Sequence, residues 1–556
     1  MGLPIPQSFI SSNHWDVVVI GAGAAGLMAC LEMPKDLKIL LLNRNTSRRS
    51  ASRWAQGGIA AVIRPEDSLD SHAEDTLKAG AGLCDLNAVK MFVTEAPNCV
   101  RRLESLGMEF DRFDNKLSTT LEAAHSHRRV LHVKDRTGRA LVDVLEDQVE
   151  QSQNIFHHRG VRVTQLLVEN KSCYGVQVLD GPYLYYVSSR AVVMASGGGG
   201  HLFVNTTNPS QACGEGIALA WKAGAVIEDL EFVQFHPTAL KLKGAPCFLL
   251  SEALRGEGAV LLDQYGDSPV SDLHGSDLAP RDQVSRTLVE VMQKQKVDYM
   301  GLDLTTIPLD LLESRFPTIL GQCRELGLEP LRELIPIAPA AHYWMGGVAT
   351  NLQSATSIKA LYAVGEVACT GLHGANRLAS NSLMECLVFA KQMGCIQLQE
   401  KFRFTKKEFQ SSQINFSIPI NGFDSSDSIV DAIKELRILC WKEAGVTRSI
   451  KGMKKALISI QTDFARVSEE PLLKLIENQK EEEILHFDNP SRKNLNLLLD
   501  LNHRQLTTSL LLEACLFRTE SRGGHFRTDA PTSLPYWRSH SRQRKGHNLS
   551  TRDVSL

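Results

Sequence analysis

The sequence predicts an α/β protein built around a Rossmann-like dinucleotide-binding domain. Four apolar residues, 17–20, run directly into the pattern Gly21-x-Gly23-x-x-Gly26, and small residues that suit a helix follow. A second apolar run, 38–43, is the expected next strand of a βαβ unit. At 556 residues the chain is too long for one core, so two to four domains are expected.

Composition argues against several classes of protein. The 61 Lys+Arg residues nearly balance the 63 Asp+Glu residues, so bulk charge gives no reason to expect a nucleic-acid partner. No apolar stretch reaches the roughly 18 residues of a membrane span, and residues 1–14 lack the blocks of a signal peptide. The twelve cysteines form no Cys-x-x-Cys pair. We therefore expect reduced thiols in a cytoplasmic protein, without disulfides or metal ligands.

The three glycines of the turn have separate physical roles. Gly21 allows the tight turn, Gly23 lets the backbone approach a pyrophosphate, and Gly26 lets helix and strand pack closely. Free N–H groups at the start of the helix would bind the phosphates. The contacts expected here are Gly21, Ala22, Gly23, Ala24, Ala25 and Gly26.

The end of the second strand indicates which dinucleotide is bound. A site for NAD usually carries an acidic residue there, to bind a ribose hydroxyl. This chain has Asn43-Arg44, which favours FAD. The next segment, 50–61, resembles the flavin-binding loop of the succinate dehydrogenase/fumarate reductase/L-aspartate oxidase superfamily. The resemblance implies cofactor contacts from Arg44, Ala51, Ser52, Arg53, Trp54, Ala55, Gln56, Gly57 and Gly58.

Position 51 bears on how the flavin is attached. Respiratory members of the superfamily have a histidine there, five residues before the glutamine, and it binds the flavin covalently. The residue in this chain is Ala51, so the resemblance implies non-covalent FAD. Later glycine-rich segments resemble the strands by which the superfamily returns to the cofactor. They imply further cofactor contacts from Glu215, Glu366, Ser382 and Leu383.

A histidine-rich block, 122–132, admits two interpretations. Its three histidines invite a metal site, but no further cluster is spaced to complete a coordination sphere, so we expect none. The block is similar to the His-Ser-His-Arg-Arg signature of the L-aspartate oxidases within the superfamily. That resemblance implies that Glu122 binds the substrate's amino group, for which a carboxylate is the natural partner.

Further motifs resemble the superfamily's substrate site. They imply that His236, Ser251, His342 and Arg377 bind the substrate carboxylates, with Ser251 standing where threonine is frequent. The segment 277–286 resembles the motif of the catalytic arginine, which corresponds to Arg281. Because an arginine is normally protonated, the sequence leaves open whether Arg281 is a base or an electrostatic clamp.

The motif order gives the expected domains. We expect a discontinuous FAD-binding domain over 1–229 and 344–413, with an inserted α+β capping domain over 230–343. A C-terminal helical domain is expected over 414–531, followed by a flexible basic tail over 532–556.

The resemblance as a whole implies FAD-dependent oxidation of L-aspartate to iminoaspartate, the first step of NAD biosynthesis. The flavin would be reoxidised by fumarate or by O2, and the product would feed quinolinate synthase, a partner the sequence leaves open. One alternative is a soluble fumarate reductase or succinate dehydrogenase flavoprotein. Another is a non-catalytic flavin-bound interaction protein, against which the set Arg281, His342 and Arg377 argues.

Overall fold

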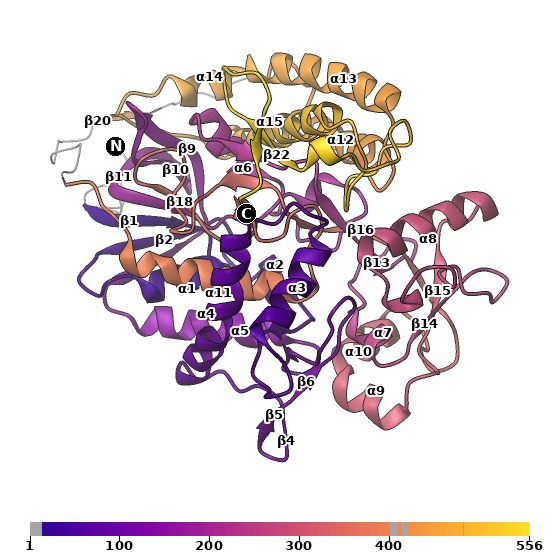
Figure 1. Ribbon diagram of the computed structural model, residues 1–556. Helices are drawn as coiled ribbons and strands as arrows, with labels where there is room; N and C mark the ends of the chain where they lie inside the picture. The colour runs from indigo at the N-terminus through magenta and orange to yellow at the C-terminus, as the bar shows by residue number, and fades with distance from the viewer. Residues whose placement is uncertain (1–13, 401–409, 414–419, 482, 556) are drawn as a thin grey trace.

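The computed structural model describes residues 14–400, 410–413, 420–481 and 483–555. The lead-in 1–13 and the expected domain boundary at 413/414 lie largely outside this part. A central nine-stranded sheet, a separate unit at one side and a layer of C-terminal helices make up the molecule (Figure 1). The predicted α/β class, with capping and C-terminal helical parts, is confirmed.

The central sheet is parallel in its middle. β1 pairs in parallel with both β2 and β11, and β2 pairs in parallel with β8. Its strands are β1 (Trp15–Ile20), β2 (Ile39–Asn43), β8 (Ile155–Arg159), β9 (Val161–Glu169), β10 (Ser172–Asp180), β11 (Tyr183–Met194), β18 (Leu361–Ala363), β20 (Gln410–Gln413) and β21 (Glu483–His486).

Both faces of this sheet are covered. Along β1, Val17 and Val19 belong to one hydrophobic core and Val18 and Ile20 to another, as the two-residue period of a strand requires. The helices of this region are α1 (Ala24–Glu32), α2 (Ala51–Trp54), α3 (Leu69–Ala79), α4 (Leu86–Ser105), α5 (Thr137–Gln151), α6 (Glu215–Lys222) and α11 (Asn381–Lys391). Two small sheets flank it, β3 (Ile59–Ala60) with β7 (Val130–Leu131) and β6 (Thr119–Thr120), and β4 (Arg112–Phe113) with β5 (Lys116–Leu117).

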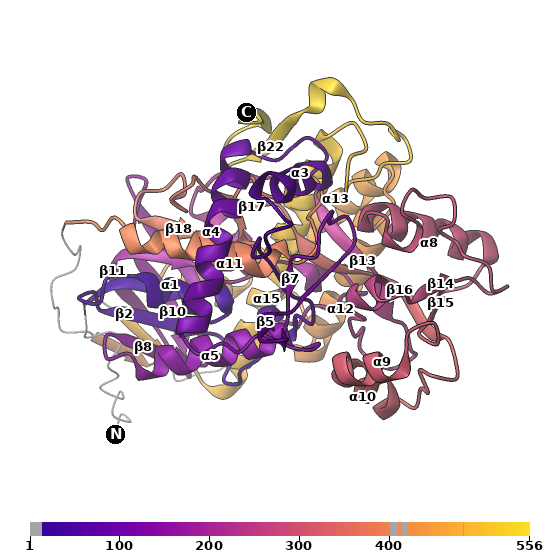
Figure 2. The same ribbon diagram turned by 60° about the horizontal axis from the view of Figure 1, so that its bottom comes forward.

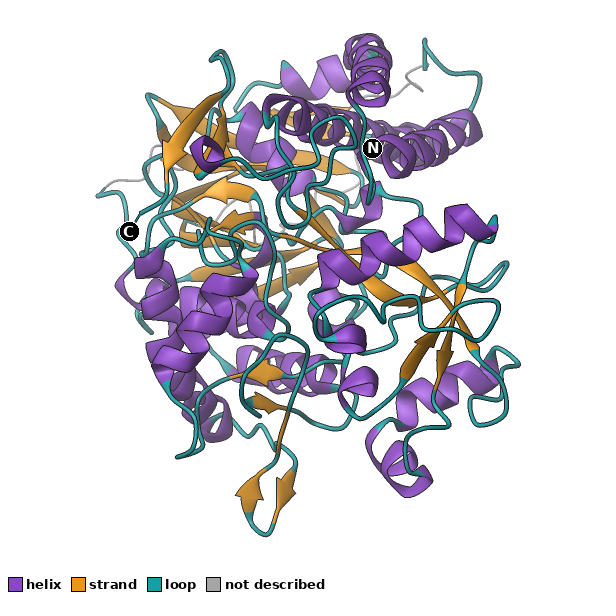
Figure 3. Ribbon diagram, turned by 45° about the vertical axis from the view of Figure 1, so that its right-hand side comes forward, coloured by secondary structure: helices purple, strands orange, loops and turns teal. Residues whose placement is uncertain are grey.

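The inserted unit has its own core and projects from one side (Figures 1 and 3). Its antiparallel sheet has the order β13-β16-β15-β14. The elements are β13 (Val233–Leu240), β14 (Val260–Leu262), β15 (Met300–Asp303) and β16 (Ile335–Trp344), with α7 (Ala253–Gly256), α8 (Arg281–Gln295), α9 (Leu309–Arg315) and α10 (Pro317–Glu325). We call this unit the cap.

The C-terminal region consists mainly of helices that pack on the central sheet. They are α12 (Ser426–Ala444), α13 (Ile450–Ser468), α14 (Pro471–Glu477) and the long α15 (Asn489–Phe517). α15 carries eighteen buried residues and contributes leucines to the same core as Val18. The region is not purely helical, because its strand β21 joins the central sheet beside β11.

The prediction of a flexible tail over 532–556 was wrong for the residues described. β22 (Ser539–Gln543) pairs with β12 (Ile227–Glu228) and with β23 (Ser550–Asp553). The same sheet contains β17 (Gly347–Ala349) and β19 (Ala368–Cys369). Figure 2 shows the C-terminal segment beside the start of α4, where the Leu86 N–H donates to the carbonyl of Ser555. Two basic residues of this segment, Arg542 and Arg552, form ion pairs with Glu228.

Candidate functional site

The glycine turn accepts no larger residue. Gly21 has a φ of 110°, and a Cβ there would lie 2.3 Å from the carbonyl oxygen of Ala195. A Cβ on Gly26 would lie 1.9 Å from the Gly21 carbonyl oxygen, so this glycine sets how closely α1 approaches β1. The N-cap of α1 is Gly23, and no side chain caps the helix. The Ala24 N–H donates to Oγ of Ser52 at 3.3 Å, and the rest of this uncapped helix start can receive an anionic ligand.

A cavity opens above this turn. The predicted cofactor residues that line it are Gly21, Ala22, Gly23, Ala25, Arg44, Ala51, Ser52, Trp54, Ala55, Glu215, Glu366, Ser382 and Leu383. They come from segments far apart in the sequence, as the superfamily resemblance implied. Buried Oγ of Ser196 also lines the cavity and has no hydrogen-bond partner among the described residues. A glycine-floored cavity with a free helix start and an unpaired hydroxyl fits a dinucleotide such as FAD.

Six predicted cofactor residues do not line this cavity: Ala24, Gly26, Arg53, Gln56, Gly57 and Gly58. The Arg53 side chain forms an ion pair with Asp143 of α5 instead. Gly58 lies against the backbone of β7, where a Cβ would be 2.1 Å from the Leu131 carbonyl oxygen. A Cβ on Gly57 would lie 3.7 Å from Oε1 of Glu122. Arg53 and Gly58 thus contact other parts of the protein and do not line the cavity.

Arg44 belongs to a partly buried group of alternating charges, in which its own side chain is 28% exposed. Its Nη2 contacts both carboxylate oxygens of Asp500, at 2.7 and 2.9 Å, and its Nη1 lies 3.4 Å from Oε2 of Glu215. Arg162 bridges the same two acids, with Nη2 2.5 Å from Glu215 and 3.0 Å from Asp500. Burial alone would raise the pKa of Glu215, but Arg162 and Arg44 hold it well below its usual value. Asp500 lies on α15, so the C-terminal region supports this end of the cavity.

A second set of predicted residues meets where the cap contacts the rest of the molecule. The neutral amide of Gln234 joins two guanidinium groups, because its Oε1 accepts from Nη1 of Arg281 and from Nη2 of Arg377, both at 2.9 Å. Glu252 fixes Arg281 from the other side, through Nε at 2.9 Å and Nη2 at 2.7 Å. Burial first, and then the charge of Arg281, lowers the pKa of Arg377 to about 10.

The two predicted histidines lie side by side. β13 pairs with β16 so that His236 is opposite Ala340, and the rings of His236 and His342 are 5.1 Å apart. Burial and the nearby Arg281 hold both pKa values well below the ordinary histidine value. Both rings are therefore neutral at pH 7. Nδ1 of His342 is 2.9 Å from Oγ1 of Thr207, which lines the cofactor cavity.

Glu122 is the acidic member of this group. It is 3% exposed, and burial first, then Glu252, raises its pKa above the usual value. Arg281 lies close enough to act in the opposite direction. Oε2 of Glu122 accepts a hydrogen bond of 2.6 Å from Oγ of Ser380. The Ser251 hydroxyl is buried and accepts from the Ala253 N–H at 3.3 Å, so its hydrogen bond stays within its own turn.

Sequence reasoning missed four residues that organise the site: Gln234, Glu252, Ser380 and Asp500. Gln234 is two positions before His236 in an extended strand, and residues two apart share a face, which is a signal that could have found it. Glu252 directly follows Ser251 in the predicted substrate-binding turn. Asp500 gave no local signal, because its partner Arg44 is 456 residues away in the chain.

A second cavity, of ≈ 960 Å³, lies between the cap and the rest of the molecule. Cap residues 240–247 form one wall and residues 201–210 the other. It shares Trp54, Asn208 and Pro209 with the cofactor cavity, so it leads from the edge of the cap toward that cavity.

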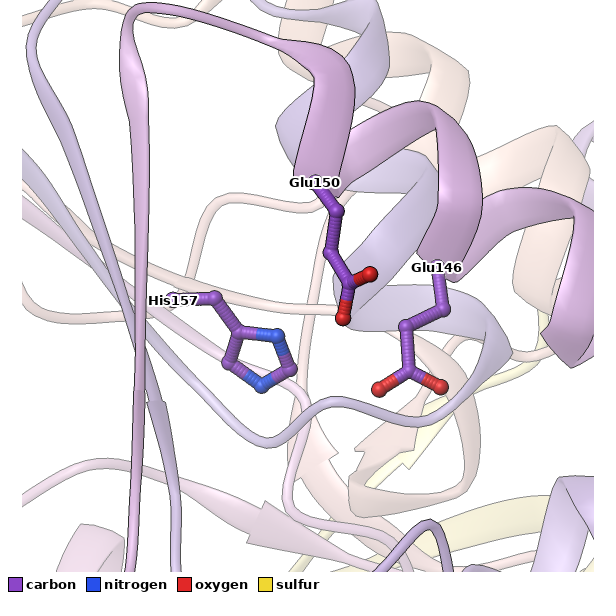
Figure 4. Close-up of side chains that lie close together, drawn as sticks. All are labelled: Glu146, Glu150 and His157. Atoms are coloured by element: carbon purple, nitrogen blue, oxygen red, sulfur yellow. The ribbon is translucent and has the colours of Figure 1, made fainter.

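The histidine block at 122–132 does not form a metal cluster among the described residues. A group with ligand atoms close together does occur elsewhere, at Glu146, Glu150 and His157 (Figure 4). Arg159 bonds both carboxylates at 2.6 Å, and Arg48 adds a second positive charge. The two acids are thus already neutralised by arginines.

Comparisons with known proteins place the chain among flavoproteins. Residues 16–383 match the family described as FAD binding domain, and residues 433–555 match fumarate reductase flavoprotein C-term. The second match extends through the C-terminal strands. In structure, the chain resembles a quinol fumarate reductase of E. coli, with a TM-score of 0.85, 26% identity and 98% of each chain covered.

Curated relatives are more similar in sequence. A protein of Nostoc sp. named L-aspartate oxidase is 44% identical over 97% of this chain and 95% of its own length. The chloroplastic L-aspartate oxidase of Arabidopsis thaliana is 36% identical over 94% of this chain and 82% of its own. No helix among the described residues is long and apolar enough to cross a membrane.

Proposed function

This chain belongs to the L-aspartate oxidase family of FAD-binding flavoproteins, and from that premise we propose that it oxidises L-aspartate to iminoaspartate. In this role it opens NAD biosynthesis. The product is an unstable imine, and we propose quinolinate synthase as the enzyme that consumes it.

One observation carries the proposal: the buried carboxylate of Glu122, which unlike Glu252 forms no ion pair with an arginine among the described residues, lies near the buried guanidinium groups of Arg281 and Arg377. Aspartate has two carboxylates and one ammonium group, so its charges are the mirror image of this set. Arg281 and Arg377 present planar forks that suit carboxylates, and Glu122 suits the ammonium. The neutral rings of His236 and His342 add hydrogen bonds without adding charge.

The protein's part in the reaction is to orient the substrate and exclude water. Gln234 and Glu252 fix Arg281, so the arginine reaches the substrate without reorganising. The cap contributes Arg281 and Gln234 to this buried group, and burial strengthens each charged contact. When bound, FAD supplies the two-electron oxidation and passes the electrons to fumarate, giving succinate, or to O2, giving peroxide.

We also propose that FAD is bound without a covalent bond. Ala51, in α2, offers no nucleophile at the wall of the cavity. Acid precipitation of the loaded protein should therefore release all the flavin into the supernatant. All twelve cysteines are free thiols, which supports a reducing compartment such as the cytoplasm.

Turnover by purified, FAD-loaded protein tests the proposal. With L-aspartate and fumarate under nitrogen, we expect one succinate for each oxaloacetate formed by hydrolysis of the imine. Succinate with an artificial electron acceptor is the matched reaction of a soluble fumarate reductase or succinate dehydrogenase. Turnover of succinate but not of aspartate would overturn the proposal in favour of that alternative.

A further inference from the structure

The hydroxyl of Ser380 is aimed at Glu122 deep inside the protein. The two side chains are 7% and 3% exposed, and the Oγ–Oε2 distance is 2.6 Å. Among the described residues, this is the hydrogen bond that the Glu122 carboxylate accepts. Its other oxygen, Oε1, would lie 3.7 Å from a Cβ on Gly57, so Glu122 adjoins the loop behind the cofactor cavity.

Ser380 is held in an unfavourable backbone conformation. Its φ of 59° is left-handed, a region that residues other than glycine, asparagine and aspartate seldom adopt. Four hydrogen bonds fix the turn around it. The Ala60 N–H donates to the Ser380 carbonyl at 3.2 Å, and Nε2 of His125 lies 2.9 Å from the Ala379 carbonyl oxygen. Asn381 bonds His72 and Thr76, each at 3.1 Å.

His125 is itself held on its far side. Nη1 of Arg129 lies 3.2 Å from its Nδ1, and Arg129 is fully buried between Asp67 and Asp75. Since Arg129 can only donate, Nδ1 accepts and Nε2 carries the proton that bonds Ala379. The histidine block therefore has a mechanical role, because it connects a buried ion-pair cluster to the turn that carries Ser380.

We propose that Ser380 is a positioning residue for amine recognition: its hydroxyl, fixed by the His125 support, aims the ionised Glu122 carboxylate at the ammonium group of the substrate. This inference rests on the proposed function. A hydroxyl can donate to a carboxylate while adding no charge, so Glu122 keeps its full attraction for a cation. A protonated Glu122 would lose that attraction.

The charges around Glu122 make the hydroxyl necessary. Glu252 faces it as a like charge, while Arg281, Arg315 and Arg377 face it as opposite charges. Burial and Glu252 raise the pKa of Glu122, and the Ser380 hydrogen bond lowers it. Loss of the hydroxyl should therefore raise this pKa further. Aspartate binding should then fail at a higher pH as the solution is acidified.

The test compares Ser380→Ala and Ser380→Gly with the wild type. Glycine adopts the left-handed conformation freely and alanine does not. Comparing the two variants therefore distinguishes the effect of losing the hydroxyl from the effect of backbone strain. We expect kcat/KM for aspartate to fall about tenfold in both variants, the loss typical of one hydrogen bond to a charged group. The acid limb of the kcat/KM profile should move to higher pH. Fumarate reduction and the Kd for FAD should stay within about twofold.

The chain offers a closely matched control in Ser354. It is also buried, also has a φ of 59°, and its Oγ donates at 3.1 Å to the Phe389 carbonyl. Ser354→Ala and Ser354→Gly should leave the pH dependence of kcat/KM for aspartate unchanged. His125→Phe should shift the acid limb as the Ser380 variants do, and His125→Gln, which keeps a donor for Ala379, should restore it.

Two outcomes would overturn the inference. One is an acid limb that does not move in the Ser380 variants. The other is an equal loss of aspartate oxidation and fumarate reduction, which would make Ser380 part of the flavin site. In both cases the wild type still turns over aspartate, so the proposed function stands. A wild type inactive with aspartate would instead overturn the proposed function.

Discussion

At the scale of residues, the site is a set of like charges kept apart by a neutral linker. Arg281 and Arg377 would repel each other in an empty pocket, and Gln234 accepts a hydrogen bond from both. The depressed pKa of Arg377, caused by burial and then by Arg281, reflects that repulsion. Under the proposed function a dicarboxylate would relieve it, so the pocket would be arranged for a doubly acidic substrate before one arrives.

Arg281→Lys should abolish most aspartate turnover and leave FAD content normal. A lysine cannot contact Glu252 and Gln234 with a rigid fork, and Arg281 does not line the cofactor cavity. We expect kcat to fall at least about 100-fold, the scale of removing one positioned donor. Steady-state assays and the flavin absorbance of the purified variant measure the two quantities. Loss of the flavin together with activity would show that Arg281 is structural.

At the scale of elements, α15 supports a cavity-lining residue from another part of the chain. Asp500 binds Arg44 through both oxygens, and Arg44 lines the cavity at the end of β2. Arg162 and Glu215 complete the group, so each buried charge has an opposite partner. Removing one carboxylate leaves the positive charge of a buried arginine without its full negative partner. This destabilises the protein more than replacing the whole ion pair by apolar residues would.

Asp500→Asn should weaken FAD binding about tenfold, since Arg44 loses its bidentate partner and part of its fixed orientation. Fluorescence titration of the apoprotein measures the Kd. The matched control is Glu513→Gln on the same helix, where the carboxylate bonds only Gln461 among the described residues. An unchanged Kd for Asp500→Asn, or an equal change in the control, would contradict the role given to α15.

At the scale of the whole molecule, the C-terminal strands join distant parts of the chain. His540 of β22 is fully buried and contacts Asp229 through Nδ1 and Asp85 through Nε2. Burial alone would lower its pKa, but Asp229 and Asp85 raise it to about 10. The imidazolium therefore links the end of the chain to the segments before α4 and before β13.

This linkage predicts a pH dependence of stability. The folded pKa of His540, about 10, lies above the unfolded value of roughly 6.5, so its contribution is complete below pH 6.5 and declines toward pH 10. His540→Gln should lower the free energy of unfolding by several kcal/mol at pH 6.5 and by much less at pH 9.5. Urea unfolding at the two pH values measures this. If the difference in the free energy of unfolding between the wild type and His540→Gln were the same at both pH values, this would contradict the charged state of His540.

Local patterns in the sequence were enough to predict the glycine turn and the α/β class, and short motifs that resemble the superfamily named the residues that gather around Arg281. Their signals lie within short segments, where strand period and turn chemistry decide the structure. The ordered C-terminal strands were missed, because Arg542 is paired by Glu228, 314 residues away. Asp500 was missed for the same reason. Contacts of that separation depend on the assembled fold and leave no local periodicity.

We claim centrally that the Glu122 carboxylate, near Arg281 and Arg377, selects aspartate, and anaerobic stopped-flow measurements on Glu122→Gln test this most directly. Flavin bleaching by L-aspartate should slow about 10- to 100-fold relative to the wild type, as expected for a lost charged hydrogen bond. Reoxidation of the reduced flavin by fumarate, which has no amine, should remain within about threefold. Equal loss of both rates, or unchanged bleaching by aspartate, would contradict the claim.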